Sequence, residues 1–164
     1  GTAGAGAVLY RVEEHGTNTL LWKGSKWLGT YQTNNYAEYQ ALLLGLNGII
    51  SLLPRMRETC QSNSSPSGNE MKSGVYTWED TSQLLLEIQG DSRLIINQVS
   101  GKWKVHNHHL QQLHSEVQRA LETISATQCN FMYIPRARNV FADGLANIAM
   151  ETKQDMFDFV ERNI

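Results

Sequence analysis

The chain has 164 residues, of which 41% are hydrophobic and 18% are charged, and this length fits one compact domain with a core of its own. The formal net charge is −2 and the sequence pI is about 6.2. These values argue against a protein that binds nucleic acid through overall positive charge, but they leave room for a local basic patch. No apolar run is long enough for a membrane-spanning helix, and the start of the chain has no signal-peptide pattern. Cys60 and Cys129 have no metal or redox spacing, so we expect reduced thiols and an intracellular, reducing compartment such as the cytoplasm, nucleus or an organelle.

The first part of the chain predicts a hairpin followed by a helix. Small and apolar residues predict a strand over Gly4–Tyr10, and a second strand is expected over Thr19–Trp27. The short polar connection between them predicts antiparallel pairing. Thr33–Asn35 has the composition of a helix N-cap, the helical pattern covers Tyr36–Leu53, and Pro54 is expected to end the helix.

Residues 55–83 interrupt this pattern. The segment is rich in Ser, Asn, Gly and Pro and has no hydrophobic period, which predicts a flexible polar insertion on the surface of a single domain spanning residues 1–164.

The second half of the chain alternates between strand and helix patterns. A compact apolar run predicts a strand buried in a mixed or parallel sheet. The remaining segments predict three helices, one further strand and a short last helix. The expected elements are a strand at Leu84–Gln89, helices at Ser92–Val99 and Leu110–Ile124, a strand at Cys129–Ile134, and helices at Asn139–Met150 and Met156–Val160. This order predicts an α/β domain with a mixed sheet.

Glu38 is an acid on an apolar helix face. Leu42, Gly45 and Ile49 follow it at positions that share one side of a helix. The helix dipole favours an acid in the first turns, but it does not explain an acid on the face that is expected to meet the core, where an unpaired carboxylate is costly.

Two further acids follow the ends of strands. Asp91 comes directly after Gly90, and active sites of α/β sheets lie beyond the carboxyl ends of strands. Asp91 could equally cap the helix that begins near Ser92. Asp143 lies close to the start of the helix after Asn139, where the helix dipole is an alternative explanation.

Taken together, these three carboxylates suggest a site for a hard divalent cation, since oxygen ligands suit Mg²⁺ or Mn²⁺ rather than zinc. His106, His108, His109 and His114 form the other cluster of metal-ligand residue types, but their spacing favours surface residues.

Three segments of the chain resemble the ribonuclease H family (type one), in the order that the family has them. The resemblance covers almost the whole chain except residues 55–83, and it is closest to the short archaeal-like and plant-like members that lack a basic handle. The three segments are TNNYAEYQAL (residues 33–42), GDSRLIINQVSGKWK (90–104) and YIPRARNVFADGLAN (133–147).

The resemblance implies an activity and a set of catalytic residues. Glu38, Asp91 and Asp143 match three of the family's four metal-binding carboxylates. The implied enzyme is an endoribonuclease that hydrolyses the RNA strand of RNA–DNA hybrids with two Mg²⁺ or Mn²⁺ ions. Many members have a histidine in the loop before the last carboxylate, whereas this chain has Arg136 and Arg138, one of which is expected to assist the leaving group or product release.

The resemblance also implies how a hybrid would be bound. Asn34 and Asn35 match the residues that read the minor groove and the 2′-hydroxyl, with Thr33 on a phosphate beside them. A second patch resembles the site that receives the DNA strand, although core packing is an equal alternative for its tryptophan. This patch consists of Lys102, Trp103 and Lys104.

At the N-terminus this chain departs from the family. The family's first strand is the central one, and the Asp of its Asp-Gly pair is the fourth carboxylate. This chain begins at the position of the turn after that strand. We therefore expect a ribonuclease H-like mixed sheet with flanking helices that lacks its central strand, which would leave two facing strands with unpaired backbone groups. An incomplete form of a longer protein is favoured over a natural minimal domain.

Three functions fit these observations. The first is a monomeric, metal-dependent endoribonuclease acting on hybrids. The second is a non-catalytic relic of the fold that binds hybrids or a partner. The third is a domain cut from a reverse transcriptase polyprotein. An Asp-Gly strand upstream of Gly1 would favour the first over the second, and long flanking coding sequence would favour the third.

Overall fold

The computed structural model describes residues 1–62 and 84–163, so most of the predicted insertion, residues 63–83, lies outside the described residues. The helices and strands are β1 Thr2–Val12, β2 Asn18–Thr30, α1 Asn34–Ser62, β3 Leu85–Gly90, α2 Arg93–Val99, α3 His108–Ile124, β4 Gln128–Tyr133, α4 Val140–Thr152 and β5 Met156–Phe159. Short 3-10 turns follow β4 at Arg136–Arg138 and β5 at Glu161–Asn163.

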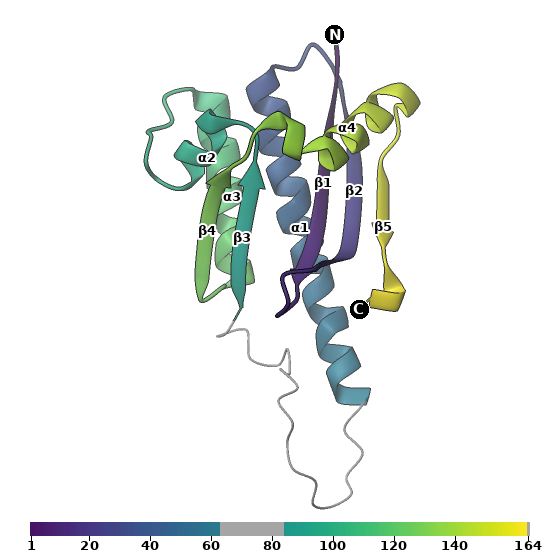
Figure 1. The fold of residues 1–164 in the computed structure, drawn as a ribbon. Helices are drawn as coiled ribbons and strands as arrows, with labels where there is room; N and C mark the ends of the chain where they lie inside the picture. Colours follow the sequence, from purple (N-terminus) through teal and green to yellow (C-terminus); the bar gives the residue numbers. More distant parts are fainter. Residues whose placement is uncertain (63–83, 164) are drawn as a thin grey trace, which may run out of the picture.

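The strands form two separate hydrogen-bonded sheets (Figure 1). β1 and β2 form the predicted antiparallel hairpin, and β5 adds to the other edge of β2. β3 and β4 pair in parallel, as is usual when helices connect the strands. Among the described residues no strand pairs with both β1 and β3. The mixed α/β fold is therefore as expected, and its central position holds no described strand.

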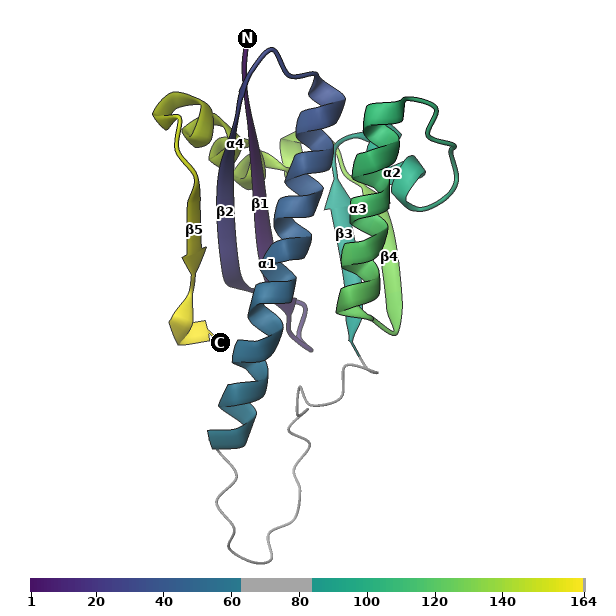
Figure 2. The ribbon, with the colours of Figure 1, turned by 180° about the vertical axis from the view of Figure 1, so that it is seen from behind.

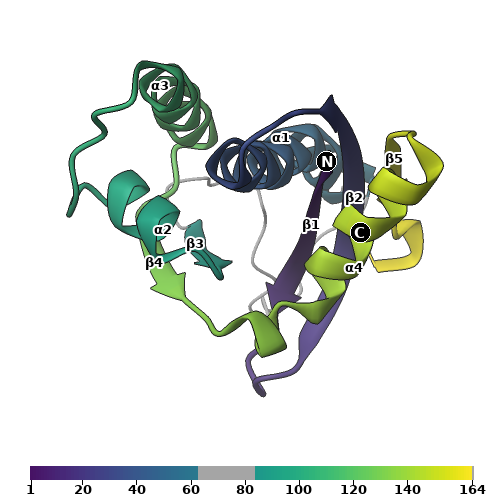
Figure 3. The same ribbon diagram turned by 90° about the horizontal axis from the view of Figure 1, so that it is seen from above.

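The helices lie on both sides of these sheets. α1 and α3 cover one face, as Figure 2 shows from behind, and α4 crosses the other face (Figure 3). The core is divided as the sheets are: Leu43 and Leu46 of α1 pack in a cluster with α2 and α3, whereas Leu44 and Leu52 pack in a second cluster with β1 and β2. α1 thus joins the two halves of the domain.

The predicted end of α1 at Pro54 is wrong, because the helix continues to Ser62. An interior proline removes one helical hydrogen bond, but packing on both sides of it favours continuation. Leu52 is buried before the proline, and the Arg55 guanidinium after it stacks on the Phe159 ring at 3.9 Å.

The predicted C-terminal helix at Met156–Val160 is also wrong, because Met156–Phe159 forms strand β5. Five residues are too few for a stable helix on their own, and the free edge of β2 offers backbone partners instead. Phe157 stacks on Trp22 of β2 with the ring centres 6.4 Å apart, and the Val160 amide donates to the Leu21 carbonyl.

The small residues at the start of the chain allow α4 to approach β1 closely. A side chain at Gly4 would collide with the carbonyl oxygen of Ala146, and one at Gly6 with that of Ala142. The glycines therefore let the backbone of α4 rest on β1, and this contact positions α4 against the sheet.

Candidate functional site

Glu38 lies half-buried in the second turn of α1, at the end of the sheets where β3 ends. Desolvation is the largest cause that raises the pKa of its carboxyl group, followed by the negative charge of Asp91, while Arg136 lowers it and Asp143 raises it. These charges come from three different elements, so the structure brings Glu38, Asp91 and Asp143 near one another. The nearby negative charges make the ionised form of Glu38 harder to keep.

The stripe that Glu38 begins on α1 lies along the boundary between the two sheets. Leu42 and Ile49 pack against the cluster that includes β3, and Gly45 faces Ala7 of β1. Each residue of the stripe is only partly buried. Glu38 therefore stands where the two half-sheets approach each other, rather than over a closed core.

Asp91 follows Gly90 at the carboxyl end of β3. The alternative that it caps α2 is wrong, because Ser92 is the N-cap and its side chain accepts a hydrogen bond from the Ile95 amide at 3.3 Å. The Asp91 carboxylate is therefore not used for capping.

Asp143 is in the first turn of α4, where the helix dipole favours an acid. Its carboxylate also accepts a hydrogen bond from the Arg136 guanidinium at 3.1 Å. Of the two loop arginines, Arg136 is the one placed at the carboxylates, and it is 78% exposed. Arg138 is exposed in the same turn, and no ion pair is recorded for it among the described residues.

The three carboxylates supply the oxygen donors that hard divalent cations prefer. In this structure the three carboxylates do not form a metal-binding cluster, since no group of three His, Cys, Asp or Glu side chains within the described residues could hold one ion. The histidines do not compete: His106, His108 and His109 are exposed, and His114 hydrogen-bonds the Gln98 carbonyl at 3.1 Å.

The residues predicted to bind a hybrid lie on the surface. Asn34 and Asn35 are exposed at the start of α1, where Thr33 caps the helix by accepting a hydrogen bond from the Tyr36 amide at 3.2 Å. In the connection between α2 and α3, Trp103 is 50% exposed, so the alternative that it packs in the core is wrong. Lys102 and Lys104 beside Trp103 are exposed as well.

Sequence reasoning missed a buried pair that links α1 to α2. The Tyr39 hydroxyl donates a 2.8 Å hydrogen bond to the Gln98 side chain, both residues being buried. Desolvation raises the pKa of Tyr39 to about 12. Tyr39 adjoins Glu38 and Gln98 is in α2, the helix after Asp91, so this bond ties together the two helices that lie next to these acids. The partners are 59 positions apart, and no local pattern signals their contact.

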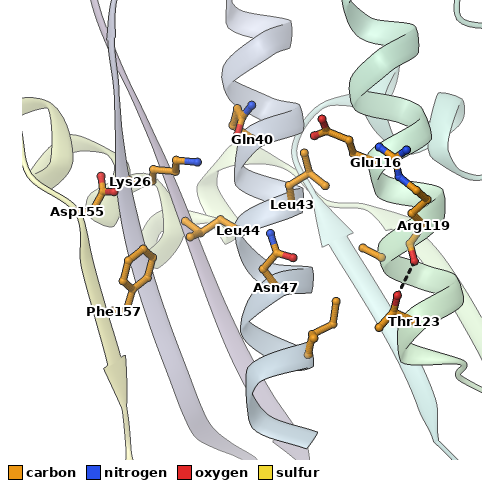
Figure 4. Close-up of a pocket in the computed structure, with 12 residues that line it drawn as sticks. Lys26, Gln40, Leu43, Leu44, Asn47, Glu116, Arg119, Thr123, Asp155 and Phe157 are labelled. Atoms are coloured by element: carbon orange, nitrogen blue, oxygen red, sulfur yellow. Dashed lines mark hydrogen bonds between the residues drawn. The ribbon is translucent and has the colours of Figure 1, made fainter.

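A groove on the outer side of α1 is separate from these acids (Figure 4). One wall carries Lys26 and Asp155, and the other carries Glu116 and Arg119 of α3. Each wall presents one cation and one anion, so the groove offers no consistent charge to a ligand. None of Glu38, Asp91 and Asp143 lines it.

Comparisons with known proteins agree with this architecture. The family model described as reverse transcriptase-like matches residues 75–149. The bifunctional protein Rv2228c of Mycobacterium tuberculosis and the uncharacterized protein Mb2253c of Mycobacterium bovis are each 30% identical over 151 residues, or 92% of this chain. The chain spans about a third of the length of these curated relatives.

Solved structures are similar over nearly the whole chain, 93% of it in each case. The N-terminal RNase H domain of Rv2228c, fused to maltose-binding protein, is 29% identical with a TM-score of 0.66 over 84% of that chain. RNase H1 of Halobacterium salinarum is 25% identical with a TM-score of 0.64 over 88% of that chain. LC11-RNase H1 in complex with an RNA/DNA hybrid is 25% identical with a TM-score of 0.60, also over 88% of that chain.

The strand order, the flanking helices and the acids at one sheet edge define a ribonuclease H-like domain. In sequence and fold the chain is similar to members of the ribonuclease H family. Members of this family generally use divalent metal ions.

Proposed function

We propose that this chain is the catalytic domain of an endoribonuclease that hydrolyses the RNA strand of RNA–DNA hybrids. The observation that carries the proposal is the half-buried Glu38, whose pKa is raised in part by Asp91 and Asp143. An acid on an apolar helix face with two other acids near it is costly to keep without a cation, and in a ribonuclease H fold this is the chemistry of a metal-dependent nuclease.

Glu38, Asp91 and Asp143 would hold the metal, which we propose to be two Mg²⁺ or Mn²⁺ ions. Bound divalent ions would polarise the scissile phosphate, activate water and stabilise the leaving oxygen. The chain's own part is to present carboxylate oxygens from α1, α4 and the end of β3. Arg136 neutralises Asp143 in the structure, and its exposed side chain can swing from the carboxylate towards a substrate phosphate.

The surface residues would bind the hybrid on both sides of these acids. The exposed amides of Asn34 and Asn35 can donate to and accept from base edges and the 2′-hydroxyl, which distinguishes RNA from DNA. Lys102 and Lys104 would contact phosphates of the DNA strand, with the half-exposed ring of Trp103 against a sugar.

The separation of the two sheets bears on activity. Within residues 1–62 and 84–163, β1 and β3 each have one edge that pairs with no strand, on either side of Glu38's helix face. The resemblance assigns the fourth carboxylate to a strand at that position. We propose that residues 1–164 alone bind Mg²⁺ weakly and cleave little. A form extended upstream through an Asp-Gly strand would cleave hybrids. We further propose a monomer in a reducing compartment, where Cys129 stays a thiol. No helix in the described residues is long and apolar enough to cross a membrane.

The test is a hybrid-cleavage assay on both lengths over a titration of Mg²⁺ and of Mn²⁺. The extended form should cleave, and its Asp91→Asn variant should bind the hybrid with little change but not cleave, because the amide keeps the size of the side chain and removes its charge. If the extended form folds and binds hybrid but cleaves nothing at any metal concentration, the enzyme proposal is wrong and a non-catalytic binding domain replaces it.

A further inference from the structure

Arg93 lies at the edge of the sheet where β3 ends, and it takes no part in the site described above. It is the first residue of α2, two positions after Asp91, and its side chain is exposed. Its position therefore puts a permanent cation at the same sheet edge as the proposed metal ligands.

An aromatic ring, rather than a carboxylate, holds the Arg93 guanidinium. The guanidinium carbon lies 4.3 Å from the centre of the Tyr133 ring. Tyr133 is the last residue of β4, in register with Gly90, the residue before Asp91. Tyr133 is itself 37% exposed, so the stacked pair lies at the surface where β3 and β4 end.

Arg93 differs in this respect from Arg136. Arg136 is paired with Asp143, but no ion pair joins Arg93 to an acid among the described residues. Stacking on one face of a guanidinium leaves its N–H groups free, since they lie in the plane of the group. The pair thus holds Arg93 at the end of β4 without an ion pair to any of the acids.

The free edge of a guanidinium matches a phosphate, because two parallel N–H groups can donate to two phosphate oxygens. The carboxylates of the proposed site would bind metal ions. An arginine whose N–H groups are unpaired can bind the phosphate backbone of the nucleic acid that those ions also contact. Stacking on Tyr133 already restricts the long Arg93 side chain, so less conformational entropy is lost when it binds a phosphate.

We propose that Arg93, held by Tyr133, binds a backbone phosphate of the hybrid on the β3–β4 side of the site. Arg93 is a substrate-binding residue and Tyr133 positions it. This inference rests on the proposed function, since it names a further contact with the same substrate.

The experiment uses the upstream-extended form of the chain and a fluorescently labelled RNA–DNA hybrid, with binding measured without metal over a series of KCl concentrations. Arg93→Ala should raise Kd by roughly three- to tenfold and lower the slope of log Kd against log[KCl] by about 1, as the loss of one phosphate contact does. In cleavage assays with metal, KM should rise by a similar factor while kcat changes by less than about twofold, because the contact precedes the chemical step.

Matched variants separate this contact from general charge and from simple packing. Arg119→Ala removes another exposed arginine, from α3 on the groove of Figure 4, and should leave Kd and the slope unchanged. Arg93→Lys should keep the slope and weaken binding less than alanine does. Tyr133→Leu should weaken binding more than Tyr133→Phe, which keeps an aromatic face.

Three results would overturn the inference: an unchanged salt slope in Arg93→Ala, an equal loss in Arg119→Ala, or a fall in kcat without a change in KM. If the unmodified protein binds no hybrid, the proposed function fails and this inference fails with it. If the unmodified protein binds and cleaves hybrid and Arg93→Ala does so equally well, this inference alone fails.

Discussion

Replacing Tyr39 by phenylalanine should destabilise the domain through a single buried hydrogen bond. The Tyr39 hydroxyl donates to the Gln98 side chain at 2.8 Å, and both residues are almost fully buried. The substitution keeps the ring and leaves a buried amide oxygen without its donor, which costs about 1–3 kcal/mol. For a domain of this size, a change of about 2 kcal/mol corresponds to a fall in Tm of roughly 4–8 °C.

The same variant makes a prediction about pH. The pKa of Tyr39 is raised to about 12 in the folded protein, whereas a tyrosine in the unfolded chain titrates near 10. Between these values the folded state binds more protons than the unfolded state, so stability falls as the pH rises. Because phenylalanine does not titrate, the difference in unfolding free energy between the original protein and Tyr39→Phe should shrink above pH 10.

Urea unfolding followed by circular dichroism, at pH 7 and at several values up to pH 11, measures both effects. Tyr10→Phe is the matched control, because Tyr10 is 45% exposed and no hydrogen bond is recorded for its hydroxyl in the described residues; its effect should stay below about 0.5 kcal/mol. If Tyr39→Phe is as stable as the original protein, or if the difference does not change with pH, the buried bond does not hold α1 against α2 as described.

Three further predictions follow. Asn34→Ala should reduce the discrimination between hybrid and DNA duplex, whereas Lys102→Ala should weaken binding to both about equally and lower the salt slope by about 1; equal loss of discrimination in both variants would contradict this division of roles. Because the pKa of Glu38 is raised in the metal-free protein, its ionisation destabilises the fold as the pH rises above 4.5, so Glu38→Gln should raise the metal-free Tm at pH 7 while weakening Mn²⁺ binding in calorimetric titrations. Gly6→Ala should lower the Tm, because the added methyl group meets the Ala142 carbonyl of α4; an unchanged Tm would mean that α4 does not rest on β1.

Much of the fold could be predicted because its local patterns agree with its packing. The stripe Leu110, Leu113, Val117, Ala120 and Ile124 is buried along one face of α3, so helical periodicity predicted that element well. The strands β3 and β4 also fall within about a residue of their predicted bounds.

The two wrong elements depend on contacts between distant residues. The helix continues past Pro54 because Arg55 reaches Phe159, about a hundred positions away, and Met156–Phe159 is a strand because β2 offers it an edge. Neither partner is visible in a local window, and proline or a short apolar run predicts the opposite outcome when taken alone.

For the candidate site, the sequence provided the residue types and the structure provided their neighbours. The pattern singled out Glu38, because an acid interrupts an apolar face. The pattern left open whether Asp91 caps α2, and the structure shows that Ser92 is the cap instead. The Tyr39–Gln98 bond and the Arg93–Tyr133 stack join residues of separate elements, so no local sequence pattern predicts these contacts.

The central claim is that these acids serve cleavage of RNA within a hybrid, and one comparison of substrates tests it most directly. The upstream-extended protein is assayed with Mg²⁺ on four substrates. A labelled RNA strand is supplied either free or paired with DNA, and a labelled DNA strand is supplied either in the hybrid or in a DNA duplex. Cleavage of the RNA in the hybrid alone, absent from Asp91→Asn, is the predicted result. Equal cleavage of free and hybrid RNA, or cleavage of the hybrid that survives Asp91→Asn, would contradict the account.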